Sequence, residues 1–320
     1  MNVHALEAVS SSRLAGALAR FEAQFTYPLG PGRSFRISHG DDYARFFRAL
    51  GEGRCFVAER DERVLGVLGA AVRPLMFPGG ERRAALYVGD LKVDPRVQGG
   101  RMVMRLASAV VGWLDERTEF AFGVVMDGTR ATPPQYTGRL GLPGFTALGK
   151  IGVVRLAASP RSERGDGGRW KAWQAADRDG EECHARLVSD GYACPVACDP
   201  SRSEMARCWL VDPAGSACGC LEDTLRSKRL YDVEDGSEIR SAHLSCFAYG
   251  SPAQGIELIG AALAATACRG LRHLFVAVPA RDTATFVTHF RHRVDVAAPA
   301  TVFGTGLEPG WPWNINVSEI

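Results

Sequence analysis

The stretch best suited to chemistry is 92–106, where an extended segment passes through two adjacent glycines, Gly99 and Gly100, into an amphipathic helix. A strand that ends in a glycine turn before a helix leaves several main-chain N–H groups without partners, at the positive end of the helix dipole. Such a turn suits a phosphate or pyrophosphate group. Gln98 could add a side-chain donor, and Arg101 a permanently charged one. The alternative is a turn in which the glycines serve only the geometry of the chain.

The cysteines offer a second kind of chemistry, metal binding. The chain has nine of them, and all but Cys55 lie in the second half. Zinc sites favour ligand pairs separated by about two to four residues, a spacing that only Cys194 and Cys198 approach. Cys218 and Cys220 lie in a predicted strand, so their side chains should point the same way rather than converge on an ion. We expect buried thiols, with structural zinc as the alternative.

Histidines could also bind a metal, and His289 and His292 have the spacing of one helix face. No third ligand is evident near them in the sequence, and Arg291 and Arg293 would repel a cation. We expect this stretch to be the end of a helix, where its positive charges complement the helix dipole. We therefore predict no metal site.

Composition excludes several classes of protein. The chain has 320 residues, 46% of them hydrophobic and 23% charged, with a net charge of +2. This is globular composition without the concentrated basic run that a nucleic-acid binder needs. No apolar run is long enough to span a membrane, and the first residues lack the pattern of a signal peptide. Together with the odd number of cysteines, this predicts a cytoplasmic protein that binds neither nucleic acid nor membrane.

The elements that would position the 92–106 stretch can be predicted from apolar spacing. The first half should hold two helices, a hairpin, a strand, the helix after the glycine turn, a buried strand, a short helix or turn, and a last strand. In that order they cover 12–25, 41–51, 54–75, 84–93, 101–117, 119–128, 133–141 and 145–158. Met102, Leu106, Val110 and Leu114 form the apolar face of the fifth element.

The second half repeats this order in a weaker form. A polar, glycine-rich linker, 159–169, separates a first domain, 1–158, from a second, 170–320. A hairpin, a strand, an apolar helix, a buried strand and a helix then follow, over 207–225, 237–250, 255–270, 271–279 and 283–293. We infer an internal duplication in an α/β fold with a mixed sheet.

The element order of the first half and the segment "LKVDPRVQGGRMVMRLA" resemble the GNAT acetyltransferase family. In that family the strand end and the glycine turn hold the pantetheine and pyrophosphate of acyl-CoA. The resemblance therefore implies acetyl-CoA as the acyl donor, and two tandem GNAT-like domains. The donor-binding residues that it implies are Leu91, Lys92, Val93, Gln98, Gly99, Gly100, Arg101, Met102 and Val103.

The family motif, Q/R-x-x-G-x-G/A, fits this chain in two registers. If Gln98 takes the first position, Arg101 replaces the first motif glycine and Val103 the final small residue. If Arg96 takes the first position, Gly99 falls on the glycine and Arg101 on the final small position. A bulky Val103 would crowd a pyrophosphate, whereas Arg101 could contribute a charge that glycine cannot.

Two residues look like the family's catalytic groups. Asp90 lies on the strand where the family often has an acidic base, and Tyr136 resembles the tyrosine that protonates the leaving thiolate. The alternative for Asp90 is an ion pair with Lys92 or Arg96, and the alternative for Tyr136 is packing under a helix. Because side chains alternate along a strand, Tyr87 should face away from Asp90.

These features predict an N-acyltransferase that passes an acetyl group directly to the amine of a small molecule. The second domain has no basic residue after its turn until Arg269, so we expect it to be degenerate: it would complete the fold, line the substrate cleft or form a homodimer. Trp311 and Trp313 either shape the acceptor pocket or pack a terminal strand. The alternative to an enzyme is a catalytically inactive, GNAT-like binding or regulatory protein.

Overall fold

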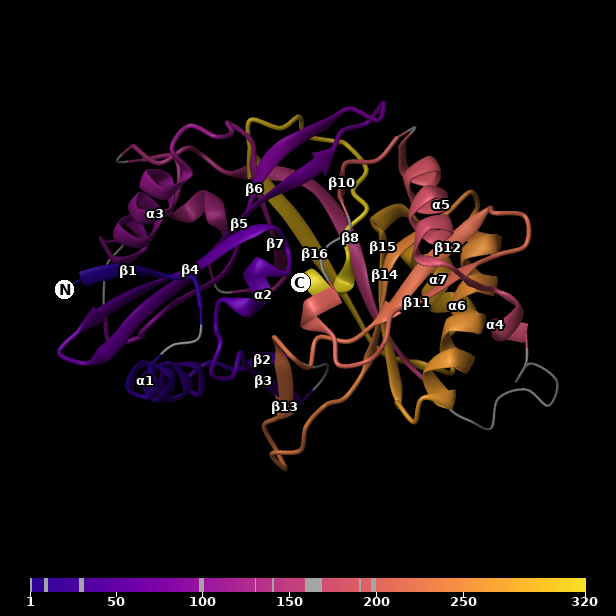
Figure 1. Ribbon diagram of the computed structural model, residues 1–320, viewed down its shortest axis with the longest axis horizontal. Coiled ribbons are helices and arrows are strands. Elements are labelled where there is room, and N and C mark those ends of the chain that lie inside the picture. Colours follow the sequence, from indigo (N-terminus) through magenta and orange to yellow (C-terminus); the bar gives the residue numbers. More distant parts are fainter. Residues whose placement is uncertain are drawn as a thin grey trace.

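The computed structural model describes residues 2–8, 11–28, 32–97, 101–129, 131–139, 141–158, 169–189, 191–196 and 200–320. Within these ranges, one sheet of thirteen strands runs through the molecule, beside a second sheet of three strands. Helices cover both faces of the large sheet (Figure 1). The fold is therefore the mixed α/β architecture that the sequence predicted.

The large sheet joins strands from both halves of the chain. From one edge to the other its order is β1 (Asn2–Leu6), β4 (Glu52–Arg60), β5 (Arg63–Met76), β6 (Arg82–Val93), β7 (Ala121–Met126), β16 (Val294–Thr305), β8 (Thr146–Ala157), β15 (His273–Pro279), β14 (Ala242–Tyr249), β12 (Ala217–Glu222), β11 (Cys208–Val211) and β9 (Gln174–Ala175). The short strand β10 (Cys194–Pro195) pairs with β5 outside this row.

The helices lie on the sheet as their apolar faces dictate. They are α1 (Ser12–Glu22), α2 (Arg45–Arg48), α3 (Arg101–Leu114), α4 (Arg169–Ala172), α5 (Asp177–Ser189), α6 (Pro252–Cys268) and α7 (Ala280–His289), with single 3-10 turns η1 (Pro133–Gln135), η2 (Pro200–Arg202) and η3 (Val317–Glu319). On the first half of the sheet, α1 and α2 share one core with one face, and α3 shares another with the opposite face. In Figure 1 these helices accordingly lie on the left, and α4, α6 and α7 on the right.

Helical spacing predicted α3 correctly, because Met102, Leu106 and Val110 are the buried residues of this helix. Two other helix predictions need correction. The stretch 41–51 forms only the four-residue α2, preceded by a turn in which Asp42 accepts hydrogen bonds from Arg45 and Arg48. Helix α7 ends at His289, so His292 lies beyond it and the two histidines share no helix face.

Strand β16 was not predicted, and it lies in the middle of the sheet. It pairs with β7 on one side and with β8 on the other, both antiparallel. β8 in turn pairs with β15. Each half of the chain thus places its last strand beside strands of the other half. One sheet crosses the molecule without a break, and the domain boundary at 159–169 stays a prediction.

The small sheet also joins the two halves. Its strands are β2 (Tyr27–Pro28), β3 (Ser34–Ser38) and β13 (Arg229–Asp232). β13 pairs antiparallel with β3. Arg33 Nη2 adds an ion pair with Asp232 Oδ2 at 3.0 Å.

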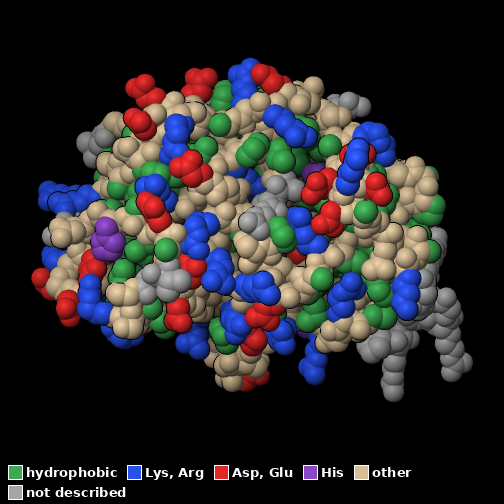
Figure 2. Space-filling view, in the orientation of Figure 1, with side chains coloured by type: hydrophobic (Ala, Val, Ile, Leu, Met, Phe, Trp, Pro, Cys, Tyr) green, Lys and Arg blue, Asp and Glu red, His purple; other side chains and the backbone are tan. Residues whose placement is uncertain are grey.

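The surface is mixed in charge. Lys and Arg side chains gather over the middle of the face seen in Figure 2, near α2 and the small sheet, and acidic side chains lie among them. Arg45 and Arg48 of α2 both pair with Asp42, and Arg229 pairs with Glu204. Such pairing lowers the local net charge. In the described part of the chain, none of the helices has the length and apolar character that crossing a bilayer requires.

Candidate functional site

Strand β6 contains a bulge at the position of Asp90. The backbone of Asp90 has a φ of +55°, a conformation that is uncommon for residues other than glycine. The register with β5 shifts here, between the pairs Val67↔Lys92 and Gly69↔Gly89. One extra residue on β6 reverses the alternation of its side chains beyond this point.

The bulge overturns the expectation that Tyr87 and Asp90 face opposite sides of the sheet. Tyr87 lies in the core that α1 and α2 share with the sheet. Asp90 Oδ2 accepts a hydrogen bond from the hydroxyl of Tyr43, which belongs to the same core, at 2.6 Å. Both side chains therefore face α1 and α2, because simple alternation fails across a bulge.

Strands β6 and β7 diverge just before this bulge. They are parallel and pair only at Leu86↔Ala121 and Tyr87↔Phe122, although β6 continues to Val93 and β7 to Met126. On that side, the main chain of Val88 still lies against Gly123 of β7, and from residue 89 onward the main chain of β6 has no strand partner among the described residues. A strand edge left open inside a sheet offers N–H and C=O groups to an extended ligand.

A buried polar cluster lies against the bulge on the α1 and α2 face. The Asp90 cluster consists of Glu22, His39, Tyr43, Asp90 and Lys92. Lys92 Nζ donates to Asp90 Oδ1, to Tyr43 Oη at 3.2 Å and to Glu22 Oε1 at 3.4 Å. His39 Nδ1 lies 2.7 Å from Glu22 Oε1, and its ring stacks on Tyr43 with centroids 4.3 Å apart. The cluster joins α1, the turn before α2 and the bulge.

Exposure differs within the cluster. The side chain of Asp90 is 11% exposed, whereas those of Lys92, Glu22 and His39 are 2–3% exposed. Burial would raise the pKa of Asp90, but Lys92, His39 and Tyr43 outweigh it, and the net pKa lies below the ordinary value. Burial likewise opposes the charge of Lys92, yet Asp90, Tyr27 and Glu22 raise its pKa. Asp90 is thus a carboxylate, and it is the member of the cluster nearest to solvent.

The cluster also contains three residues that could bind a metal ion. Ligand atoms of Glu22, His39 and Asp90 all lie within 4.8 Å of one another, the one such group in the part of the chain that the structure describes. The ammonium of Lys92, however, lies within hydrogen-bonding distance of both carboxylates. It supplies the positive charge that an ion would bring, so these residues do not fit a resident metal.

Five of the cysteines share one buried core. Cys218 and Cys220 of β12 both lie in one core with Cys183, Cys194 and Cys246. The two side chains of β12 thus point the same way, as predicted. Cys198, the other half of the predicted zinc pair, lies outside the described residues.

Of the predicted donor-binding residues, those that the structure describes lie at the end of β6 and at the start of α3. Lys92 turns its side chain toward α1, whereas Leu91 and Val93 pack on the face that α3 covers. Arg101 is the exposed first residue of α3, followed by the buried Met102 and the half-buried Val103. Gln98, Gly99 and Gly100 lie outside the described residues.

Tyr136 directly follows η1 and is half-buried. Burial raises its pKa to about 12, which keeps the phenol protonated. Within the described ranges, no hydrogen bond joins it to the Asp90 cluster. Its predicted role as the proton donor therefore stays a prediction.

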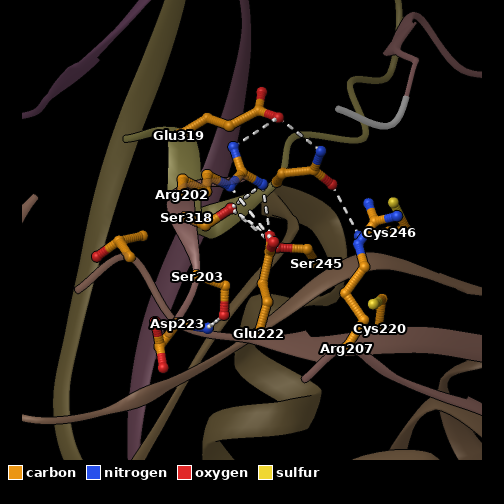
Figure 3. A network of polar contacts seen from close by, with 12 residues as sticks. Arg202, Ser203, Arg207, Cys220, Glu222, Asp223, Ser245, Cys246, Ser318 and Glu319 are labelled. Atoms are coloured by element: carbon orange, nitrogen blue, oxygen red, sulfur yellow. Dashed lines mark hydrogen bonds and ion pairs between the residues drawn. The ribbon is translucent and has the colours of Figure 1, made fainter. Parts of the chain in front are cut away.

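A second buried network lies where the two halves meet, and Figure 3 shows its centre. Arg202 pairs with Glu222 and with Glu319, and Arg73 Nη1 pairs with Glu319 Oε2 at 2.6 Å. Tyr87 Oη donates to the main-chain oxygen of Glu319 at 2.6 Å. Burial would raise the pKa of Glu319, but Arg73 and Arg202 lower it to about 2. We call residues 314–320 the 314–320 segment, and these contacts bind it to residues of both halves of the chain.

The tryptophans before this segment belong to the core. Trp313 is 1% exposed and packs against Phe122, with ring centroids 5.5 Å apart. Trp311 packs edge-on against Phe77. Trp313 forms only an isolated bridge to Ala193, so the predicted terminal strand is absent from the described segment.

Sequence analysis missed Glu22, His39 and Tyr43. Glu22 stands on the buried face of α1, where a charged residue is unusual and signals a buried partner. His39 and Tyr43 lie in and beside a turn, and nothing in their spacing relates them to Asp90. Only the packing of α1 and α2 on the sheet brings these residues together.

Comparison with known proteins shows the fold alone. No family model matches the chain, and no curated protein matches it in sequence. A Saccharomyces cerevisiae N-myristoyltransferase solved with bound myristoyl-CoA aligns over 96% of this chain and 80% of its own, with a TM-score of 0.57 and 9% identity. A structure of that enzyme with myristoyl-CoA and inhibitors covers 99% of this chain and 83% of its own, with a TM-score of 0.59 and 8% identity.

Proposed function

We propose that this protein is an acyl-CoA-dependent N-acyltransferase. The observation that carries the proposal is the divergence of β6 from β7 beside the bulge and the buried cluster at Asp90. The open edge of β6 can take an extended pantetheine arm, and the start of α3 can take its pyrophosphate. The similarity in fold to an N-myristoyltransferase that holds myristoyl-CoA supports the same reading.

In this proposal the donor lies along β6 and reaches the start of α3. Main-chain groups of Leu91–Val93 pair with the pantetheine, and Gln98, Gly99 and Gly100 form the turn around the pyrophosphate. N–H groups of Met102 and Val103 add to the positive end of the helix. Arg101, exposed at the first position of α3, adds a charge that a glycine turn alone lacks.

The chemical step is a direct transfer. The acceptor nitrogen attacks the thioester carbonyl carbon, the C–S bond breaks, and an amide bond forms. Asp90 accepts the proton that the nitrogen loses, a role for which its carboxylate state and its exposure suit it. Tyr136, a phenol that stays protonated, supplies the proton for the leaving thiolate.

The finer parts of the proposal follow from the family resemblance. The acyl group is acetyl, the acceptor is the amine of a small molecule, and the chain is a tandem pair whose second half binds no donor. No metal takes part, because Lys92 supplies the positive charge between the two carboxylates. A cytoplasmic location and a homodimer remain predictions.

A calorimetric titration tests the donor site. Acetyl-CoA, myristoyl-CoA and free CoA are titrated into the unaltered protein and into a Gln98→Ala/Arg101→Ala variant. Arg105→Ala is the matched control, because Arg105 is exposed on the same helix one turn further along. We expect the double variant to bind acyl-CoA at least about tenfold more weakly, because it lacks the two side-chain donors proposed for the pyrophosphate. A tenfold loss corresponds to about 1.4 kcal/mol of binding free energy.

The titration also distinguishes the alternatives. Tight binding of acetyl-CoA relative to free CoA would identify the donor, and preference for myristoyl-CoA would replace acetyl by a long acyl chain. If neither thioester binds the unaltered protein, the enzyme proposal fails. A non-catalytic binding protein would then be the better description.

A further inference from the structure

Strand β14 has a position in the sheet of the second half that corresponds to the position of β6 in the first half. β6 lies between an antiparallel neighbour, β5, and a parallel one, β7, which the chain reaches through α3. β14 lies between antiparallel β12 and parallel β15, which the chain reaches through α6. The two strands therefore have an antiparallel neighbour on one side and a parallel neighbour on the other, and a helix connects each of them to its parallel neighbour.

Both strands carry the same backbone irregularity. Cys246 in β14 has a φ of +49°, and Asp90 in β6 has +55°. Among the described residues other than glycine, these two are the ones within strands that have a positive φ. The register of β12 with β14 also shifts beside Cys246, and the parallel pairing of β14 with β15 ends at Leu244↔Val276, before the bulge.

The two halves differ in what lies at the bulge. The N–H of Cys246 donates to Asn316 Oδ1 at 2.7 Å, and Asn314 Nδ2 donates to the C=O of Phe247 at 2.7 Å. Two side-chain amides of the 314–320 segment thus bind main-chain groups of β14. The turn η3 of the same segment lies against both β14 and β15. Ser318 Oγ adds contacts with Ser245 and with the buried Glu222.

We propose that the 314–320 segment is the permanent ligand of a second donor-type groove, the counterpart in the second half of the edge that β6 opens in the first. The inference rests on the proposed function, because it takes the open edge of β6 to be the donor site. The amide carbonyl of Asn316 lies on the N–H of the bulge residue, where a ligand carbonyl would accept a hydrogen bond. The chain therefore binds one acyl-CoA and not two.

The same segment also reaches the first groove. Tyr87 is the last residue of β6 that pairs with β7, and its hydroxyl donates to the main chain of Glu319. Arg73 of β5 binds the carboxylate of Glu319. The ligand of the second groove is thus anchored where the first groove opens, so the segment joins the two sites.

Hydrogen exchange of the Cys246 main-chain N–H tests this inference, because Asn316 binds that group. The folded protein is transferred to D2O, and deuterium uptake at individual residues is followed by mass spectrometry with fragmentation. The N–H of Cys55, which lies inside β4 between β1 and β5, reports full protection. The proteins compared are the unaltered chain, Asn314→Ala/Asn316→Ala, and the control Asn2→Ala, which makes the same change at an exposed position.

We expect the Cys246 N–H to be as protected as that of Cys55 in the unaltered and control proteins, and to exchange at least about tenfold faster in the double variant. If it stays as protected as that of Cys55 in the double variant, the inference fails. Should the double variant lose its folded circular dichroism spectrum, Asn316→Ala alone takes its place, with the same two outcomes.

The stoichiometry of acyl-CoA separates the two proposals. One acyl-CoA bound per unaltered chain agrees with both of them. Two bound per chain would overturn the inference and leave the proposed function intact. No binding at all would overturn the proposed function, and with it the interpretation of either groove as a donor site.

Discussion

At the scale of single residues, the candidate site depends on Lys92 as much as on Asp90. The sequence placed Lys92 on the strand that holds the donor and, as the alternative for Asp90, in an ion pair with that residue. The structure has this ion pair, and the Lys92 ammonium lies between the carboxylates of Asp90 and Glu22 and balances part of their charge. A buried ion pair of this kind stabilises little in itself, but removal of one partner leaves an uncompensated charge.

Replacement of Lys92 by methionine tests this role. Because the folded pKa of Asp90 is lowered, its ionisation stabilises the protein above the unfolded pKa, and this contribution is lost as pH falls through the folded pKa. Without the ammonium the folded pKa should rise, so the acid limb of acyl transfer should move to higher pH. Unfolding in urea should show a loss of about 3–5 kcal/mol near neutral pH.

The matched control is Lys171→Met, a change at an exposed lysine. It should alter neither the pH profile nor the urea midpoint. An acid limb that stays in place in Lys92→Met would show that Asp90 is not the group that titrates in catalysis.

At the scale of elements, the decisive piece is β16, which lies between β7 and β8. Its sequence, with Pro299 inside an alternating run, does not read as a central strand, because proline removes a ladder hydrogen bond. The strand forms because β7 and β8 each have an edge whose main-chain groups need hydrogen-bond partners. β16 lies between the two edges and pairs with both. Tertiary pairing thus overrides a weak local preference.

Close packing of β16 against β7 predicts that Gly304→Ala destabilises the protein. A Cβ at Gly304 would lie 2.4 Å from the carbonyl oxygen of Ala121 and 2.6 Å from Leu148 Cδ1. We expect a loss of about 1–3 kcal/mol in thermal or urea unfolding. Gly260→Ala is the control, because no atom lies within 4 Å of its added Cβ and alanine favours a helix interior. Equal stability of the two variants would contradict the close approach of β16 to β7.

At the scale of the whole molecule, the two halves of the chain contribute strands to one sheet. β8 of the first half lies between β15 and β16 of the second, and the 314–320 segment is bound by residues of both. The small sheet adds a further link through β3 and β13. The composition of the linker therefore does not imply that the two halves of the chain separate freely.

Cleavage of the linker tests this coupling. A protease site inserted within 159–168 and cut in the folded protein should give two fragments that elute together in size-exclusion chromatography. They should separate only in denaturant. β8 of the first fragment pairs with β15 and β16 of the second, and β16 pairs with β7 of the first, so these main-chain hydrogen bonds lie in the centre of the sheet. Fragments that separate in native buffer would show that the interface between the halves is weak.

The sequence by itself determined the local elements and the class of the fold. The helical apolar spacing of α3, the alternation in β4 and β5, and the glycine turn ahead of Arg101 are short-range signals, and the structure has the predicted elements around them. These features also carried the family resemblance. Asp90 was named because that resemblance implies an acidic base on its strand.

Only the tertiary structure decided what surrounds Asp90 and how the halves are joined. The bulge at Asp90 reversed the side-chain alternation, which no periodic pattern can predict. Glu22 and His39 come from segments far from β6 in the chain, and they meet it through packing. The place of β16 likewise depends on unpaired edges supplied by distant strands. Contacts of this kind are long-range, so no window of the sequence contains them.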